Sequence, residues 1–251
     1  VYAEAQKTQP WKQWAEDGAR QMVESGTTAA ADIVTDLDAA GALASQGMHG
    51  IAYWEVMGWH NAEWMEKGRT ELIRQLRRMN EEQLPNLGIS PHAPYTLESE
   101  PFVDLPDIAR QLNMRLHIHL AETPLEAGTY PPVLTTYSAA DWSDHDWESY
   151  RQLKEVGKGA SAIQFVDQLG SLGPDVHIAH GVWANGEDRR ILRQRGVGVA
   201  LCPRSNRITN TGKDAPVREY LEEGNLVSVG TDSLSSTPTL DLLDEVSMLY
   251  D

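Results

Sequence analysis

The sequence predicts an α/β fold, a distorted (β/α)8 barrel of the TIM type from which one strand is missing. Apolar strand-like stretches alternate with helix-like stretches along the whole chain, an order that implies parallel strands joined by crossover helices. The length of 251 residues suits one such barrel. Nearly every expected strand also runs into a polar or ionisable residue at its carboxyl end, where active sites of this fold lie.

Seven short stretches are expected to be strands because each is apolar, bounded by turn-forming residues and followed by a helical pattern. In order, they are residues 27–34, 49–56, 86–90, 115–121, 176–179, 197–201 and 226–229. A complete barrel of this type has eight strands, so we expect one strand to lie outside this sequence.

The helices are expected from apolar residues that recur at helical spacing. In order, they are residues 11–24, 61–84, 102–112, 151–169, 187–195, 215–223 and a last helix from 240. Gly26 ends the first helix, and Pro106 is expected near the first turn of the third. Residues 123–150 are rich in proline and glycine, which predicts a long irregular connection of the kind that is usually functional.

The charge of the chain excludes several classes of partner. The formal net charge is −16 and the isoelectric point is about 4.8, so the surface repels phosphate backbones and anionic lipid headgroups. No run of about 18 apolar residues exists, and residues 1–11 lack the layout of a signal peptide. We therefore expect a small-molecule substrate, with neither nucleic acid nor a membrane as partner.

Cysteine usage indicates a reducing compartment. Cys202 is the only cysteine, which rules out an intrachain disulfide and leads us to expect a cytoplasmic protein. The cysteine-rich zinc site of base-flipping deaminases is also excluded, because its Pro-Cys-x-x-Cys pair is absent.

The expected carboxyl ends of the strands carry side chains that bind or react. They are Glu55, His92, His119 with Glu122, His180, Asn206 and Asp232. In a barrel these ends converge on one face, so the side chains are expected to share one site.

The stretch His117-Ile118-His119 places both imidazoles on one face of a strand, because side chains alternate. A single histidine in a strand is more often a hydrogen-bonded core residue than a metal ligand. Two histidines followed by Glu122 favour a metal site, since histidine is the commonest metal ligand. His117 lies one layer deeper and is expected to pack or to support His119.

Asp232 and His180 each have a structural alternative. Asp232 could cap the helix expected from residue 240, since aspartate is a good N-cap. Gly230 permits close backbone approach, and residues 235–238 supply capping side chains nearer that helix, which favours Asp232 as a ligand. His180 could be a structural histidine in a turn with Gly181, but its position on the strand after His119 favours a site residue.

Six short motifs, each found once, are informative because of the order in which they follow one another along the chain. They are Ser25-Gly26-Thr27-Thr28, Ser90-Pro91-His92-Ala93-Pro94-Tyr95-Thr96, His117-Ile118-His119-Leu120-Ala121-Glu122-Thr123, Ala179-His180-Gly181-Val182-Trp183, Cys202-Pro203-Arg204-Ser205-Asn206 and Gly230-Thr231-Asp232-Ser233. Together they resemble the amidohydrolase superfamily, in the branch of cytosine deaminase-like and adenosylhomocysteine deaminase-like enzymes. Each motif is weak alone, but six in order from residue 25 to the end are specific. The motif at 202–206 is also similar to that of aminofutalosine deaminases.

The resemblance implies a metal-assisted hydrolysis. His119 would be a metal ligand, and Asp232 a second ligand that also accepts a proton from the bound water. Glu122 would carry that proton to the substrate ring and to the departing ammonia, and His180 would hydrogen-bond the attacking hydroxide. The chemistry is physically consistent, because bound Zn²⁺ lowers the pKa of water to about 7 and a nearby carboxylic acid can protonate the ring as it is attacked.

The resemblance also implies substrate contacts from His92 and Glu122, and from Arg204 or Asn206 at the next strands. The metal is expected to be Zn²⁺, with Fe²⁺ as the other ion that histidine and carboxylate ligands suit. Exposed-looking tryptophans, Trp142 and Trp147, suggest a surface for a homodimer.

One departure from the family pattern is clear. Family members carry a His-x-His pair at the end of their first strand and a small β-domain built from both termini, and no such pair precedes Trp11. We therefore expect residues 1–251 to be one barrel domain truncated at both ends. Two ligands alone are too few for a tight zinc site.

The sequence leaves the reaction open between several candidates. The first is deamination of an aminopurine-like nucleoside of the aminofutalosine, adenosylhomocysteine or methylthioadenosine type. The same barrel also serves chlorohydrolases and cyclic amidohydrolases. A catalytically inactive binding relative is the remaining alternative, supported by the absent His-x-His pair.

Overall fold

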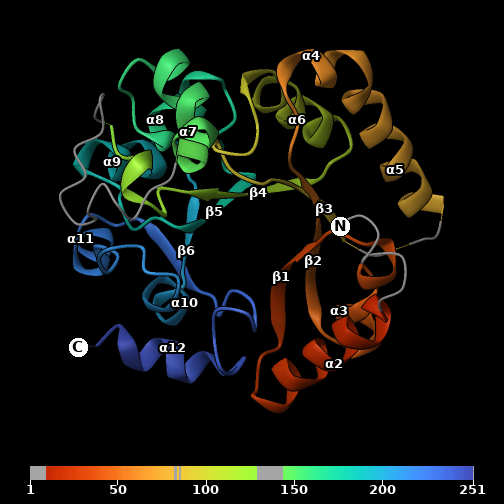
Figure 1. Cartoon of the computed structure of the whole chain (residues 1–251). Helices are drawn as coiled ribbons and strands as arrows, with labels where there is room; N and C mark the ends of the chain where they lie inside the picture. Colours follow the sequence, from red (N-terminus) through yellow and green to blue (C-terminus); the bar gives the residue numbers. More distant parts are fainter. Residues whose placement is uncertain (1–9, 82–83, 85, 129–143, 251) are drawn as a thin grey trace.

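The computed structural model describes residues 10–81, 84, 86–128 and 144–250. Seven parallel strands form one sheet in the order β1-β2-β3-β4-β5-β6-β7, so each strand pairs with the next along the chain. The sheet curls into an incomplete barrel with helices around its outer side (Figure 1). Within the described residues, β1 and β7 form the two edges of the sheet and do not pair with each other. The predicted α/β barrel fold is confirmed, with seven strands in the described part of the chain.

The strands agree with the predicted ranges to within two residues at either end. They are β1 (Ala29–Val34), β2 (His49–Val56), β3 (Leu87–Pro91), β4 (Arg115–Leu120), β5 (Val176–His180), β6 (Gly198–Leu201) and β7 (Leu226–Val229). The principal helices are α2 (Trp11–Glu24), α3 (Ala42–Ser45), α4 (Asn61–Glu63), α5 (Arg69–Glu81), α6 (Ser99–Gln111), α7 (Asp144–Gly157), α8 (Ala162–Gln168), α9 (Gly186–Arg195), α10 (Pro203–Ile208), α11 (Val217–Glu222) and α12 (Leu242–Met248).

The helix predicted at 61–84 is interrupted by a π-helical turn, Trp64–Gly68, which lies between α4 and α5. The Trp64 ring is fully buried, and its Nε1 donates to Asp104 Oδ2 over 2.8 Å. A Cβ on Gly68 would lie only 2.7 Å from the Trp64 ring and 2.9 Å from the Trp59 ring. Packing of these two indoles against the backbone at Gly68 therefore accompanies the local widening of the helix.

The helix predicted at 151–169 is two helices, α7 and α8. The chain takes left-handed conformations at Lys158 (φ 49°) and Gly159 (φ 88°), which end α7. Ser161 then caps α8, accepting a hydrogen bond from the Gln164 amide over 3.1 Å. The sequence pattern missed this break because both segments carry apolar residues at helical spacing.

Two further predictions need correction or fall outside the described residues. Pro106 is not near a first turn, because α6 already begins at Ser99 and the proline lies in its second half. Of the irregular stretch predicted at 123–150, residues 129–143 lie outside the described residues, and so does Trp142. The described part contains a 3-10 turn, Pro124–Glu126, and the first half of α7, which includes the backbone of Trp147.

The core lies between the strands and the outer helices. On β4, Leu116, Ile118 and Leu120 are fully buried, and the strand contacts α6. The alternation of a strand then turns His117 and His119 to the opposite, inner face, as predicted. No helix in the described ranges combines the length and the apolar character needed to cross a bilayer.

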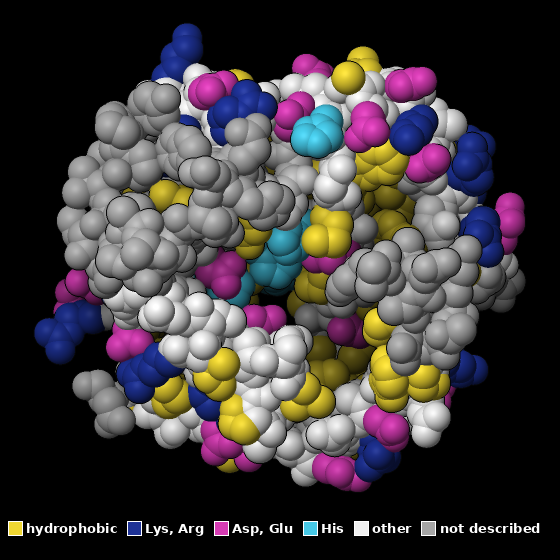
Figure 2. All heavy atoms as spheres, in the orientation of Figure 1, with side chains coloured by type: hydrophobic (Ala, Val, Ile, Leu, Met, Phe, Trp, Pro, Cys, Tyr) yellow, Lys and Arg dark blue, Asp and Glu magenta, His cyan; other side chains and the backbone are white. Residues whose placement is uncertain are grey.

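The carboxyl ends of three strands share an uncommon backbone conformation. Ala121 follows β4 with φ 55°, His180 ends β5 with φ 74°, and Asp232 lies beyond β7 with φ 58°. Left-handed conformations at non-glycine residues cost of order 1 kcal/mol each and cluster where side chains are held for function. The corresponding face of the molecule contains a hollow lined by histidine and acidic side chains (Figure 2).

Candidate active site

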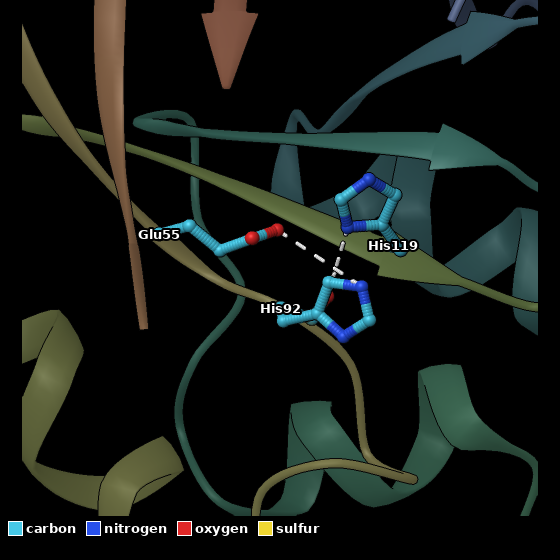
Figure 3. Close-up of side chains that lie close together, drawn as sticks. All are labelled: Glu55, His92 and His119. Atoms are coloured by element: carbon cyan, nitrogen blue, oxygen red, sulfur yellow. Dashed lines mark hydrogen bonds and ion pairs between the residues drawn. The ribbon is translucent and has the colours of Figure 1, made fainter. Parts of the chain in front are cut away.

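Three neighbouring strands bring Glu55, His92 and His119 together. Glu55 lies near the end of β2, His92 directly follows β3, and His119 is in β4. One ligand atom from each side chain lies within 4.8 Å of the others (Figure 3). His92 Nε2 and Glu55 Oε1 are 4.0 Å apart. Imidazole nitrogen and carboxylate oxygen are both metal ligands, so this cluster can contribute to a cation site.

The hydrogen bonds of the two histidines fix which ring nitrogen faces the cluster. His119 Nδ1 lies 3.1 Å from the carbonyl oxygen of His92, which can only accept, so Nδ1 carries the proton and Nε2 keeps its lone pair. The Thr96 hydroxyl donates to the Ala93 carbonyl over 3.2 Å and lies 2.8 Å from His92 Nδ1. The single hydroxyl proton is thereby used, so His92 Nδ1 donates to Thr96 and His92 Nε2 is also free to accept.

His180 and Glu122 form the other half of the site. His180 Nε2 lies 3.8 Å from Glu122 Oε1, and Tyr95 donates its hydroxyl proton to Glu122 Oε2 over 3.2 Å. The His180 ring lies beside that of His119, with 5.6 Å between their centroids. The predicted residues His92, His119, Glu122 and His180 are therefore linked by direct contacts at the carboxyl ends of β3, β4 and β5.

Asp232 follows β7 and is held by hydroxyl groups. Its Oδ2 accepts a hydrogen bond from Ser205 Oγ over 2.6 Å and from Ser236 Oγ over 3.2 Å. Its charge acts on His119, whose pKa it raises against the larger lowering effect of burial. The alternative assignment of Asp232 as a helix cap is wrong, because Asp241 caps α12 through a 2.9 Å bond to the Leu243 amide.

Burial sets the charge state of the cluster. Together with the neighbouring His119 and His180, burial lowers the pKa of His92 to about 3, and burial is the largest of these causes. Burial also lowers the pKa of His119, with His180 as the next cause. Glu55 is affected in the opposite sense, since burial raises the pKa of its carboxyl to about 6. Histidines that stay neutral at physiological pH keep the lone pairs that metal binding and proton transfer require.

Arg204 lies away from this cluster. Its guanidinium and backbone amide bind Glu245, and further guanidinium bonds reach the Thr239 hydroxyl, the Asp244 carboxylate and the carbonyls of Thr239 and Asp241. These contacts attach α10 to α12 and use the donors that a substrate would need. We therefore assign Arg204 to the packing of α12, and the predicted substrate contact does not follow from its position.

Asn206 is placed behind His180 rather than beside the hollow. It is buried, and its Oδ1 lies 2.9 Å from His180 Nδ1. Its position therefore fits a residue that orients His180, a different role from the predicted substrate contact.

The sequence assigned no role to several residues that the structure brings to the site. Glu55 was expected at the shared strand ends without a role of its own, and Tyr95 and Ser205 stood only as members of motifs. Glu126 accepts hydrogen bonds from the backbone amides around Glu122. No sequence pattern predicts this role, because a carboxylate that accepts backbone amides has no characteristic spacing from them.

Residues 7–129 and 135–251 match the amidohydrolase family. The chain belongs to the amidohydrolase family. This assignment agrees with the resemblance predicted from the six motifs, and it fits a barrel whose strand ends carry histidines and acidic residues.

The chain is also similar in sequence to individual amidohydrolases of named activity. The chain is 30% identical over 235 residues to a 5-methylthioadenosine/S-adenosylhomocysteine deaminase of Thermococcus kodakarensis, covering 92% of the chain and 49% of that protein. It is 31% identical over 234 residues to a 5'-deoxyadenosine deaminase of Methanopyrus kandleri, covering 92% and 48%. The chain thus spans about half the length of the curated relatives it matches.

Solved amidohydrolase structures share the fold. The aminofutalosine deaminase of Helicobacter pylori superposes with a TM-score of 0.71 at 21% identity, over 94% of this chain and 57% of that one. An adenosine deaminase of Xanthomonas campestris with bound zinc gives 0.70 at 23% identity, over 95% and 51%. At these identities the likeness establishes the barrel alone.

Proposed function

We propose that the chain is the barrel of a metal-dependent hydrolase that deaminates an adenosine-type nucleoside and releases ammonia. The observation that carries the proposal is the contact of Glu122 with His180, directly beside His119, at the carboxyl ends of β4 and β5. Side chains that could carry a proton, orient a water molecule and bind a cation therefore lie beside one another. The names of the relatives narrow the substrate to nucleosides such as methylthioadenosine, adenosylhomocysteine, 5'-deoxyadenosine and aminofutalosine.

The donor set fits a divalent cation. We propose His119 and Asp232 as ligands, because His119 Nε2 is free and the Asp232 charge acts on His119. Glu55 and His92 form the other donor set that includes His119. We expect Zn²⁺, with Fe²⁺ as the alternative. A bound cation of this kind lowers the pKa of water so that it can attack at neutral pH.

The side chains of the chain itself would move the protons. Asp232, held by Ser205 and Ser236, accepts a proton from the attacking water. His180 donates through Nδ1 to Asn206, so its Nε2 accepts from the remaining O–H of that water and orients it. Water adds to the amidine carbon of the substrate, and the C–N bond to the amino group then breaks.

Glu122 would serve both sides of this addition. A carboxyl group at this position would receive the first proton of the attacking water from Asp232 and give it to the ring nitrogen as the carbon is attacked. It would then take the hydroxyl proton of the adduct as the C=O bond forms and give it to the departing amine, which leaves as ammonia. The Tyr95 hydroxyl holds one Glu122 oxygen and leaves the other beside His180. His92 Nε2 is free to contact the ring of the substrate.

The experiment is a direct assay of ammonia release by the full-length protein supplied with Zn²⁺. The panel contains adenosine, 5'-deoxyadenosine, methylthioadenosine, adenosylhomocysteine and aminofutalosine. We expect release from at least one nucleoside, and a rate lower by about 10²–10⁴-fold in a Glu122→Gln variant that keeps its fold and metal. A folded, metal-loaded protein that releases no ammonia from any member of the panel would overturn the proposal.

Three further properties belong to the same proposal. A single cysteine, Cys202, which is buried, supports a cytoplasmic location. The homodimer and the extent of the barrel domain, residues 1–251, stay predictions, and sedimentation and limited proteolysis of the full-length protein would test them.

A further inference from the structure

Glu126 is a fully buried carboxylate that binds three consecutive backbone amides. Its Oε1 accepts from the Ala121 amide over 2.9 Å, and its Oε2 accepts from the amides of Glu122 and Thr123 over 2.8 and 2.9 Å. Removing a charge from water costs several kcal/mol, so a carboxylate is held in such a position only by good compensating bonds. Here the compensation comes from the backbone that carries Glu122.

The segment bound by Glu126 is the point at which the chain leaves β4. Ala121 has φ 55°, a conformation that disfavours any residue with a Cβ. On its other side the same segment is bound to the turn that follows β5, because the Trp183 amide donates to the Ala121 carbonyl over 2.7 Å. The peptide units around Glu122 are thus fixed by two sets of hydrogen bonds, one to Glu126 and one to the Trp183 amide.

Lys154 in α7 binds the backbone of the residue that follows Glu126. Its ammonium is almost fully buried and donates to the carbonyl of Ala127, the next residue, over 2.7 Å. Burial lowers the pKa of Lys154 to about 8, and the Glu126 charge opposes this by favouring the ammonium. Burial and the neighbouring Glu122 charge raise the pKa of Glu126 to about 8, and its three amide bonds oppose that rise.

We propose that Glu126 is a positioning residue for Glu122, resting on the function proposed above. Its carboxylate orients the peptide units on either side of Glu122, so that the Glu122 side chain lies between Tyr95 and His180 and does not turn toward solvent. Glu126 itself touches neither the substrate nor the cation. Its effect on the reaction passes through Glu122.

The test substitutes Glu126→Gln in the full-length protein. Glutamine keeps the length of the side chain but replaces one accepting oxygen with an NH₂ group that faces backbone donors. We expect kcat to fall by about 100-fold, the range that a misplacement of about 1 Å produces, while KM changes little. Hydrogen exchange at the amides of residues 121–123 should also accelerate.

A double substitution separates positioning from a purely structural role. If Glu126 acts through Glu122, adding Glu126→Gln to a Glu122→Gln variant causes little further loss of kcat. If the two losses multiply, Glu126 does not act through Glu122 and the proposal is wrong.

Asp188 provides a matched control. It is another fully buried carboxylate that accepts a backbone amide, from Asn185 over 2.9 Å, at the start of α9. Asp188→Asn is expected to lower the melting temperature without changing kcat or KM of the folded fraction. An equal loss of kcat in both variants would assign both to general stability and overturn the proposal.

A crystal structure of the Glu126→Gln variant gives an outcome that does not depend on activity. We expect the Glu122 carboxyl to leave His180 Nε2. If Glu122 Oε1 stays at the present 3.8 Å from His180 Nε2, the proposal is wrong, whatever the activity of the variant. A wild-type protein that deaminates nothing would instead overturn the proposed function, while the position of Glu122 in the variant would still decide the role of Glu126.

Discussion

His180 Nδ1 lies 2.9 Å from Asn206 Oδ1, in a part of the protein from which solvent is excluded. This contact keeps the proton of the imidazole on Nδ1 and leaves Nε2 as an acceptor on the side of Glu122. The carboxyl end of β5 and the helix α10 therefore cooperate in fixing one tautomer.

Substituting Asn206→Leu removes this acceptor. His180 should then lose its preferred tautomer and orientation, and we expect kcat to fall by about 100-fold. The unsatisfied Nδ1–H should also cost about 1–3 kcal/mol of stability. Steady-state kinetics and urea unfolding measure the two effects. Asn206→Asp keeps an accepting oxygen, so an equally inactive Asp variant would argue against a role in holding the tautomer.

Glu122→Gln should abolish proton transfer while leaving metal binding intact. The expected loss in kcat is about 10²–10⁴-fold, the usual contribution of one general acid or base. Metal content by elemental analysis, measured beside kcat, checks the assignment. Loss of the metal together with activity would show that Glu122 supports the cation instead of carrying a proton.

Metal content also distinguishes the two donor sets that share His119. His119→Ala should remove the cation under either assignment. If Asp232 is the second ligand, Asp232→Asn lowers metal content and Glu55→Gln leaves it unchanged. The opposite pattern would move the cation to the cluster of Glu55, His92 and His119.

Arg204→Met should affect stability and not substrate affinity. The substitution leaves the fully buried Glu245 without its cation, a change that typically costs about 3–5 kcal/mol. Chemical denaturation should show that loss, and KM of the folded enzyme should be unaltered. Arg20→Met, at an exposed pair with Asp17, is the control and should unfold like the parent protein. A raised KM would restore Arg204 as a substrate contact.

Asp32 in β1 should make stability depend on pH. Burial raises the pKa of its carboxyl to about 6, above the ordinary value near 4, so the folded state favours the neutral acid. Its contribution is complete below about pH 4 and is lost as pH rises through 6, at most about 3 kcal/mol. Urea unfolding at pH 4.5, 5.5 and 7 should show this slope in the parent and a smaller one in Asp32→Asn. Asp38→Asn, at an exposed position nearby, should keep the parental slope.

Side-chain alternation explains how much of the site could be predicted from sequence. The pattern at 117–119 determined which side chains turn inward, and parallel strands bring their carboxyl ends to one rim, so His92, His119, Glu122 and His180 were expected together. The family motifs added their order. These features depend only on local periodicity and on the right order of elements.

The sequence is less informative where a side chain's direction depends on distant partners. Arg204 was expected near the substrate because of its motif, and the sequence could not show that Thr239 and Glu245, 35 and 41 residues further along the chain, would bind it. Asn206 was expected at the same surface and lies behind His180. Glu126 was overlooked because its role comes from backbone amides, which every sequence provides.

The two outer strands of the curled sheet have a practical consequence. Within the described residues, β1 and β7 each present a row of main-chain donors and acceptors with no neighbouring strand. Rows of this kind bind other extended segments. A preparation limited to these 251 residues is therefore expected to self-associate as its concentration rises.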